Sequence, residues 1–154
     1  MNDAAEDGLF QLEHAGILNK SYQRLIGKEL LAGFENDAQF AKALFHAPFA
    51  VVSHNTAADP IFNYANLTAL RLFAMDWGEF TQLPSRLSAE PVNRAERQRL
   101  LAEVSAHGYI DNYQGVRIAK TGQRFLIKNA MVWNLFDELG YKGQAACFAE
   151  WEFL

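Results

Sequence analysis

The chain has 154 residues, 50% of them apolar and 13% aromatic, and it carries a net charge of −4 at pH 7. This length suits one ordinary domain with its own core, and the acidic balance argues against a nucleic-acid-binding protein. The one cysteine, Cys147, excludes an internal disulfide and any metal site built on two thiolates.

The sequence carries no sign of a membrane protein. No segment approaches the ~20 apolar residues of a membrane span. The acidic first ten residues lack the basic and apolar regions of a signal peptide. We therefore expect a cytoplasmic protein that does not contact a membrane.

The first part of the chain, residues 1–47, is predicted to be helical. Apolar residues recur with helical spacing over 9–31, although two glycines in this segment leave open a pair of shorter helices. Asn36 and Gln39 have the spacing of a capping box and predict the start of another helix, which Pro48 ends. We expect these helices to cover one face of a sheet, either within the chain or across a dimer.

The rest of the chain, residues 48–154, contains five predicted strands. They are 48–54, 61–66, 109–120, 124–136 and 144–154. The first two are short, with β-branched and aromatic residues, and the turn residues between them predict a hairpin. The last three are long and are joined by short turns, which predicts an antiparallel meander.

Helices are predicted between the second strand and the third. Asn66 is placed to cap a helix over 67–75, and Asn93 with Glu96 has the spacing of a second capping box. The inner side of the helix that begins at Asn93 is predicted to carry Leu100, Leu101 and Val104. Its outer, solvated side is predicted to carry Arg94, Glu96, Arg97, Arg99 and Glu103.

This order of elements predicts an α+β fold, packed as one globular unit. A five-stranded antiparallel sheet has a helical insertion between strands 2 and 3, and the N-terminal helices form a cover. Such a layout is PAS-like.

Seven segments of the chain resemble one known family. They are SH at 53–54, PIFNYAN at 60–66, LPSRLSAEP at 83–91, NRAERQRLL at 93–101, YQGVRI at 113–118, VWNLFDELG at 132–140 and GQAACFAEW at 143–151. Together they resemble the MEKHLA domain, a PAS-like domain of small bacterial proteins and of the C-terminus of plant class III homeodomain–leucine-zipper proteins. The resemblance implies a PAS-like fold over 48–154 and a sensory, ligand-binding or interaction role, without naming a ligand.

The sequence offers no metal site and no catalytic constellation. No two of the four histidines fall three or four residues apart on one predicted helix. A single histidine can bind haem in PAS domains, and His107 is the candidate by position, but it also suits the last turn of a helix. PAS domains with covalent flavin photochemistry carry a reactive cysteine on the insertion, whereas Cys147 lies on the last strand, where we expect a buried, inert thiol. The cofactor is therefore unknown: haem and covalent flavin are not expected, and a non-covalent flavin is left open.

In a PAS-like layout, the hollow between the sheet and the insertion either holds a ligand or is filled by side chains. Strict alternation along 124–136 places five residues on one face: Phe125, Ile127, Asn129, Met131 and Trp133. Asn129, in the middle of four large apolar side chains, needs a hydrogen-bond partner, which is either a ligand or a neighbouring side chain or water.

Other candidate residues come from the insertion and from the third strand. Arg86 lies in the loop expected at the mouth of the pocket and is suited to bind a carboxylate, either of a ligand or of Glu90. Trp77 either walls the pocket or belongs to the core, and Tyr113 offers its hydroxyl to a ligand or to the backbone. The candidate ligand-binding residues are therefore Trp77, Arg86, Tyr113, Phe125, Asn129, Met131 and Trp133.

The leading hypothesis is a sensory domain that binds a small molecule non-covalently and signals through repacking of its helices or of a dimer. The alternative is a protein–protein interaction or dimerisation module whose own side chains fill the cavity, and a small-pocket enzyme comes third. Because both faces of the long strands carry apolar residues, we also expect a homodimer.

Overall fold

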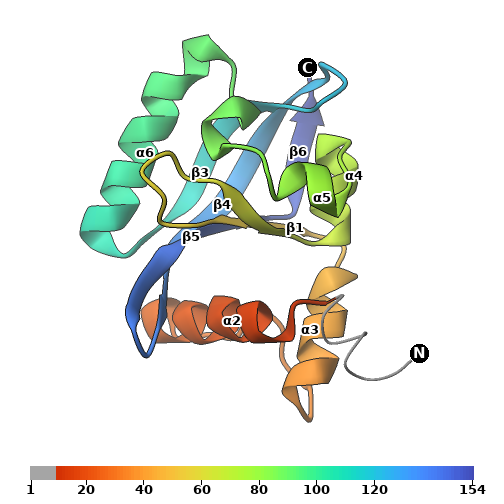
Figure 1. Cartoon of the computed structure of the whole chain (residues 1–154), viewed down its shortest axis with the longest axis vertical. Helices are drawn as coiled ribbons and strands as arrows, with labels where there is room; N and C mark the ends of the chain where they lie inside the picture. Colours follow the sequence, from red (N-terminus) through yellow and green to blue (C-terminus); the bar gives the residue numbers. More distant parts are fainter. Residues whose placement is uncertain (1–9) are drawn as a thin grey trace.

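The computed structural model describes residues 10–154, which form one antiparallel sheet with helices packed against it (Figure 1). The sheet has the strand order β2-β1-β5-β4-β3. Its strands are β1 (Ala50–His54), β2 (Phe62–Ala65), β3 (Tyr109–Ile118), β4 (Arg124–Asp137) and β5 (Gly140–Phe148). The predicted five-stranded antiparallel sheet is confirmed.

The last predicted strand is divided in two. A short strand β6 (Glu150–Phe153) pairs with the first half of β4, whereas β5 pairs with the second half. The last strand therefore begins earlier than its predicted start at residue 144 and is interrupted at Ala149.

The predicted N-terminal cover is present within the chain. A single helix, α2 (Leu12–Ile26), forms where one or two helices are predicted, and it packs on β4. Gly27 ends it with a φ of 83°, in the left-handed region that glycine adopts readily. The Tyr22 ring meets the Trp133 ring edge-on, with 5.0 Å between their centroids. The part of the predicted cover in residues 1–9 lies outside the described residues.

A second N-terminal helix, α3 (Asp37–Phe45), begins at its predicted cap. The Oδ1 of Asn36 accepts a hydrogen bond from the backbone N–H of Gln39 at 2.9 Å. The predicted division of the chain into an N-terminal helical cover (residues 1–47) and a PAS-like part (residues 48–154) stays a prediction.

Asn66 joins α3, β1 and the helix that follows it. Its Oδ1 accepts hydrogen bonds from the backbone N–H groups of Val51 (3.0 Å) and Ala69 (3.2 Å). Its Nδ2 donates to the carbonyl oxygens of Leu44 (3.0 Å) and Phe49 (2.8 Å). The side chain is fully buried, and these four bonds use the full capacity of an amide. The predicted cap is thus also a tie between three elements.

The helical insertion lies between β2 and β3 in the chain. It consists of α4 (Leu67–Phe73), α5 (Trp77–Phe80), the 3₁₀ turns η1 (Ser85–Ser88) and η2 (Pro91–Asn93), and α6 (Arg94–His107). The predicted capping box at Asn93 does not form, because this residue ends η2 and its side chain makes no capping hydrogen bond. Leu100 and Val104 of α6 pack on Val132 of β4, while the neighbouring Trp133 faces α2, so α6 and α2 cover opposite faces of the sheet.

A bulge in β4 corrects the prediction of strict alternation. Asn129 has a φ of 52°, and the β3–β4 register passes from Gly115↔Ile127 to Tyr113↔Ala130, so three steps on β4 oppose two on β3. One extra residue in a strand moves every later side chain to the other face. Phe125 and Ile127 share one face, as predicted, and this face is turned to the insertion. Met131 and Trp133 lie on the other face, against α2, and Asn129 is exposed to solvent.

Candidate functional site

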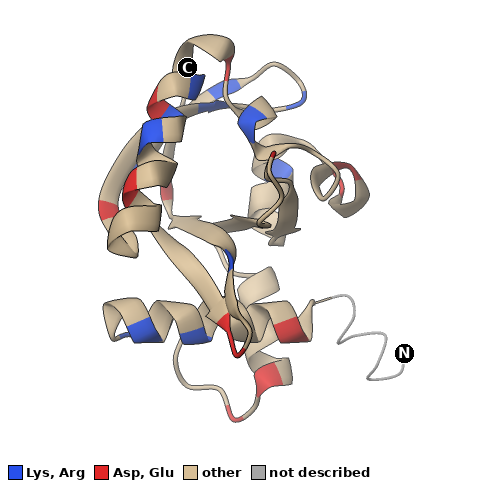
Figure 2. Cartoon of the chain, turned by 60° about the vertical axis from the view of Figure 1, so that its left-hand side comes forward, with Lys and Arg blue, Asp and Glu red and all other residues tan. Residues whose placement is uncertain are grey.

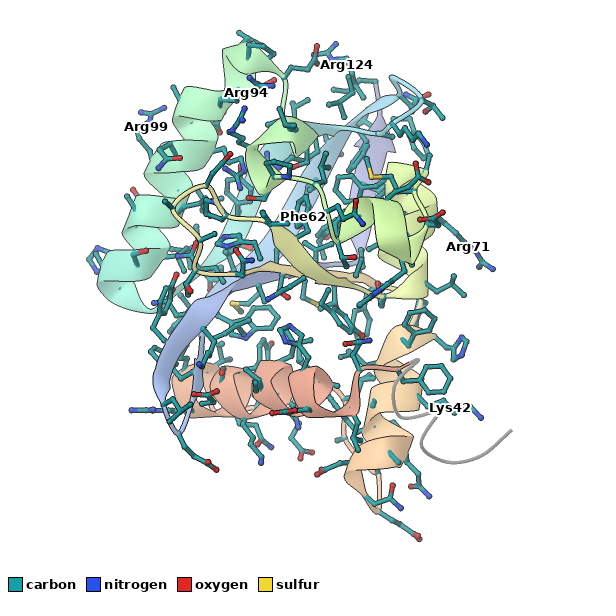
Figure 3. All side chains as sticks on the ribbon, in the orientation of Figure 1. Lys42, Phe62, Arg71, Arg94, Arg99 and Arg124 are labelled. Atoms are coloured by element: carbon teal, nitrogen blue, oxygen red, sulfur yellow. The ribbon has the colours of Figure 1, made fainter. Side chains whose placement is uncertain are left out.

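A cavity lies between the sheet and the insertion, and α6 forms one of its walls. Its volume is about 70 Å³. A single buried water needs roughly 10–15 Å³, so the cavity has room for a small organic molecule. The large apolar side chains around it are Val52, Phe62, Phe73, Leu100, Leu101, Ile127, Val132 and Phe148. Figure 3 shows Phe62 between β2 and the insertion.

Several polar side chains also line this cavity, and they come from five different elements of the fold. They include His54 of β1, Ser88 of η1, Arg97 of α6, Tyr113 and Arg117 of β3, and Gln144 of β5. No aspartate or glutamate of the described chain is among the lining residues. The polar part of the cavity is therefore rich in hydrogen-bond donors and cationic groups.

Arg97 is buried on the inner side of α6, with 6% of its surface exposed. Its Nη2 donates a hydrogen bond to Oγ of Ser85, and Ser85 is held in place because its carbonyl accepts a bond from the Ser88 hydroxyl at 2.7 Å. Burial and then the charge of Arg117 lower the pKa of Arg97 to about 10, although Tyr113 and the charge of Asp59 act in the opposite direction. Charged residues of both signs occur along α6 (Figure 2), and among them Arg97 is buried.

Arg117 is buried on β3 and is held by its own strand. Its Nη1 donates to the carbonyl oxygen of Val116 at 2.9 Å, and its Nη2 donates to the Tyr113 hydroxyl at 3.3 Å. The guanidinium carbon lies 5.7 Å from the centre of the Tyr113 ring, within the range of a cation–π contact. A Cβ at Gly115 would lie 2.1 Å from that hydroxyl, so the glycine leaves the space in which Tyr113 reaches Arg117.

Neither buried arginine has an acidic partner. The ion pairs between residues 10–154 involve five other cations, which are lysines or arginines with exposed or half-buried side chains. Buried charges in proteins are normally paired with an opposite charge. Arg97 and Arg117 are therefore exceptions within one cavity.

His54 presents a buried nitrogen to the same region. Its Nδ1 donates to the carbonyl oxygen of Asn55 at 2.9 Å, which leaves Nε2 as an acceptor in the neutral ring. Nε2 is buried and makes no hydrogen bond with any described residue. Burial, and then the charge of Arg97, lower the pKa of His54, while the bond to Asn55 and the nearby Gln144 side chain oppose this change in part. The ring is therefore neutral at pH 7.

Gln144 connects the sheet with α6 beside the cavity. Its Nε2 lies 3.1 Å from the Leu101 carbonyl oxygen and at the same distance from the Ser105 hydroxyl and from Oδ1 of Asn134. Asn134 in turn donates to the Val104 carbonyl at 2.9 Å. The packing of α6 on the sheet thus depends on a small set of polar contacts at the edge of the cavity.

The family model of the MEKHLA domain matches residues 12–153. The chain belongs to the MEKHLA domain family. The match includes α2 and α3 as well as the sheet and the insertion, so the family pattern covers both parts of the described structure. No curated protein matches the chain in sequence.

Solved structures similar to this MEKHLA domain include PAS and light-oxygen-voltage domains. The PAS domain of a protein from Colwellia psychrerythraea has a TM-score of 0.61 and 16% identity, covering 71% of this chain and 92% of its own. The light-state dimer of the fungal blue-light photoreceptor Vivid has a TM-score of 0.60 and 15% identity, covering 88% and 92%. A light-oxygen-voltage domain studied with a flavin analogue has a TM-score of 0.57 and 17% identity, covering 75% and 84%. At such identities the likeness shows the fold, and it confirms the predicted PAS-like fold class.

Of the candidate ligand-binding residues predicted from the sequence, Tyr113 lines the cavity of the MEKHLA domain. Phe125 packs on Phe73, with 5.2 Å between ring centroids, and belongs to the core. Trp77 meets Tyr64 edge-on at 5.8 Å, away from the lining residues. Met131 and Trp133 lie on the α2 face because of the bulge, as described above.

The two polar candidates also lie outside the cavity. Arg86 is exposed and forms an ion pair with Asp59, at 3.1 Å, instead of with Glu90. Glu90 pairs with Arg124. Asn129 is exposed and donates to Glu150 through its side-chain nitrogen. The prediction that Asn129 is buried is therefore wrong, because the bulge turns it to solvent.

Sequence reasoning missed Arg97, Arg117 and Gln144 as cavity residues, although a signal exists for the two arginines. Arg97 precedes Leu100 by three positions and Val104 by seven, which is the spacing of one helix face. Arg117 lies two residues after Gly115 on β3 and shares its buried face.

The histidines and the cysteine lie apart from one another in the described chain. Residues 10–154 contain no group of three or more histidine, cysteine, aspartate or glutamate side chains that could hold a metal ion. His107 is exposed at the end of α6. Cys147 pairs with Met131 in the sheet and so faces α2, and burial raises the pKa of its thiol to about 12.

None of the described helices is long and apolar enough to cross a membrane.

Proposed function

We propose that this MEKHLA domain is a sensory module that binds a small molecule non-covalently in the cavity under α6. Two features of this cavity carry the proposal: His54 Nε2 is buried without a hydrogen-bond partner among the described residues, and the guanidinium groups of Arg97 and Arg117 form no ion pair there. Buried polar groups normally have hydrogen-bond partners. A bound molecule with polar groups at one end would supply those partners.

The signal would travel through α6. Arg97 and Leu100 of α6 line the cavity, while Gln144 and Asn134 hold the same helix to the sheet through its carbonyl oxygens. A ligand that contacts both sides favours one packing of α6 over others, and its differential affinity sets the size of the population shift. The readout is a change in the surface around α6.

A homodimer is the second part of this proposal. Large apolar side chains are exposed at the β4–β5 turn and at the C-terminus, including Leu139 (87% exposed) and Phe153 (59%). The structure of Vivid is described as a light-state dimer, which is a precedent for association in this fold. Light scattering of the purified chain, with and without added ligand, measures the mass directly.

The volume of the cavity, with its side chains in their present positions, is too small for flavin. The light-oxygen-voltage relative was studied with a flavin analogue, but pockets for ligands of that size have volumes of roughly 300–1,000 Å³, against about 70 Å³ here. The thiol of Cys147 lies on the α2 face, away from the cavity. We therefore propose a ligand much smaller than flavin.

Native mass spectrometry of the purified full chain tests this function. We expect a retained mass that is released on denaturation, or a stabilising small molecule found by thermal shift. Ala130→Leu, which adds a larger side chain to the cavity wall, should abolish the effect, whereas Ala102→Leu on the exposed side of α6 should not. If no mass is retained and no compound stabilises the protein, the cavity is filled by its own side chains. The interaction-module alternative then replaces the sensor.

A further inference from the structure

We propose that the ligand is a small organic carboxylate whose anionic group binds Arg97 and Arg117 and whose apolar part contacts the hydrophobic wall of the cavity. This inference rests on the proposed function and names the ligand class for the same site. Three observations support it: the unpaired charges, the unused donors and the apolar lining.

The first observation is electrostatic. Arg97 comes from α6 and Arg117 from β3, and the charge of Arg117 acts on Arg97 in the same direction as burial does. Two buried cations destabilise each other and the fold unless an anion lies nearby. No acidic residue among 10–154 forms an ion pair with either arginine, and none lines the cavity. The charge of Asp59, which pairs with Arg86, opposes the effect of Arg117 only in part. A bound anion would offset one of the two positive charges.

The second observation concerns hydrogen-bond donors. Each guanidinium has five N–H donors. Arg97 uses one of them on Ser85, and Arg117 uses two on Val116 and Tyr113, among the contacts of the described chain. Guanidinium groups recognise carboxylates through pairs of parallel N–H bonds. The two arginines thus retain N–H donors of the kind that carboxylates accept.

The third observation concerns the rest of the cavity. Its wall consists mainly of aliphatic and aromatic side chains, such as Val52, Ile127 and Phe148. A free inorganic anion would leave this surface without a partner, and a neutral apolar molecule would leave the arginines without one. A molecule with one carboxylate and a short apolar body satisfies both. The volume of about 70 Å³ limits that body to a few carbon atoms or one small ring.

The test is calorimetric titration of the full chain with matched acids and amides. Butyrate and benzoate are compared with butyramide and benzamide, which have nearly the same shape without the charge, and with inorganic phosphate. We expect at least one acid to bind, and its amide to bind roughly 10- to 100-fold more weakly, since charge-assisted bonds are lost. Phosphate should bind more weakly than that acid.

Two variants locate the binding site. Arg97→Met and Arg117→Met should each weaken the acid by roughly 10- to 100-fold and leave the amide unchanged. Arg99→Met, which removes the same charge from the exposed side of α6 (Figure 3), should bind the acid like the parent protein. Circular dichroism checks that each variant is folded, and the acid–amide comparison on the parent protein needs no variant.

The outcomes separate the two proposals. Equal binding of acid and amide, or tighter binding of phosphate, overturns the carboxylate inference while a small-molecule site remains. An acid that binds Arg97→Met and Arg117→Met as tightly as the parent protein also overturns it. If native mass spectrometry shows a retained neutral molecule, the sensor function holds and the carboxylate inference fails. If nothing binds in either experiment, both fail.

Discussion

The Nε2 of His14 on α2 lies 2.8 Å from the Oγ of Ser53 on β1. Ser53 donates its hydroxyl proton to Oδ1 of Asn63 at 2.5 Å, so it accepts a hydrogen bond from the Nε2–H of a neutral imidazole. The His14 ring also stacks on Tyr64, with 5.6 Å between centroids. This contact joins the N-terminal cover to the sheet on the face opposite the cavity.

The His14 contact predicts a pH dependence of stability. Burial lowers the pKa of His14 from 6.5 to about 4, so between these values the unfolded chain binds the proton and the folded chain does not. The free energy of unfolding therefore falls as the pH drops below 6.5 and stops falling near 4. Between pH 7 and pH 5 we expect a loss of up to about 2 kcal/mol from this group.

Urea unfolding at pH 7 and pH 5 measures that loss. His14→Gln should lose less stability than the parent chain over this interval, because glutamine does not titrate. His107→Gln, at the exposed end of α6, is the control and should behave like the parent. An equal loss in His14→Gln and in the parent would show that another group, such as His54, carries the effect.

Asn66 should be among the most sensitive polar positions of the described chain. Asn66→Ala removes four hydrogen bonds and leaves the N–H of Val51 and the carbonyl of Phe49 without their partner, whereas the Leu44 carbonyl keeps its bond from the Ala47 N–H. Each buried unsatisfied group costs about 1–3 kcal/mol, so we expect a loss of roughly 3 kcal/mol or more. Asn36→Ala removes an exposed cap with a single bond and should cost about 1 kcal/mol. Similar losses in the two variants, measured by chemical unfolding, would contradict the role of Asn66 as a tie.

Local sequence signals predict most of the fold, because it depends on features that act over a few residues. The caps at Asn36 and Asn66 and the long alternating strands predict the elements and their order. The candidate site was much less predictable. A single residue in a left-handed conformation at Asn129 reverses the faces of Met131 and Trp133, and nothing in the alternation of β4 marks that position.

The bulge itself is testable through the backbone of Asn129. Its φ of 52° is open to glycine and asparagine but strained for a β-branched residue. Asn129→Val should therefore be less stable than Asn129→Gly by about 1–2 kcal/mol. Both variants lose the hydrogen bond to Glu150, so their difference in unfolding free energy isolates the backbone term. Equal stabilities would mean that Asn129 is not left-handed and that the face assignment of β4 is wrong.

Arg97 shows the other limit of sequence reasoning. The periodicity that places Leu100 and Val104 inside also places Arg97 inside, but a charged residue in a run of charges is ordinarily assigned to solvent. Only the assembled fold brings it beside Arg117 from a different element. The local pattern can therefore place each arginine on an inner face, but it does not show that the two meet in one cavity.

The stability of Arg97→Met without added ligand gives a last prediction. Replacing an unpaired buried charge with an apolar side chain of similar volume is often neutral or stabilising by about 1–4 kcal/mol, and the lost bond to Ser85 costs about 1 kcal/mol. We therefore expect the free energy of unfolding to stay the same or to rise. Arg99→Met should change it by less than about 0.5 kcal/mol. A fall of more than about 2 kcal/mol in Arg97→Met, relative to Arg99→Met, would assign Arg97 to the support of the fold. A rise would mean that the folded protein keeps a destabilising charge in its cavity, as expected of a residue retained to bind an anion.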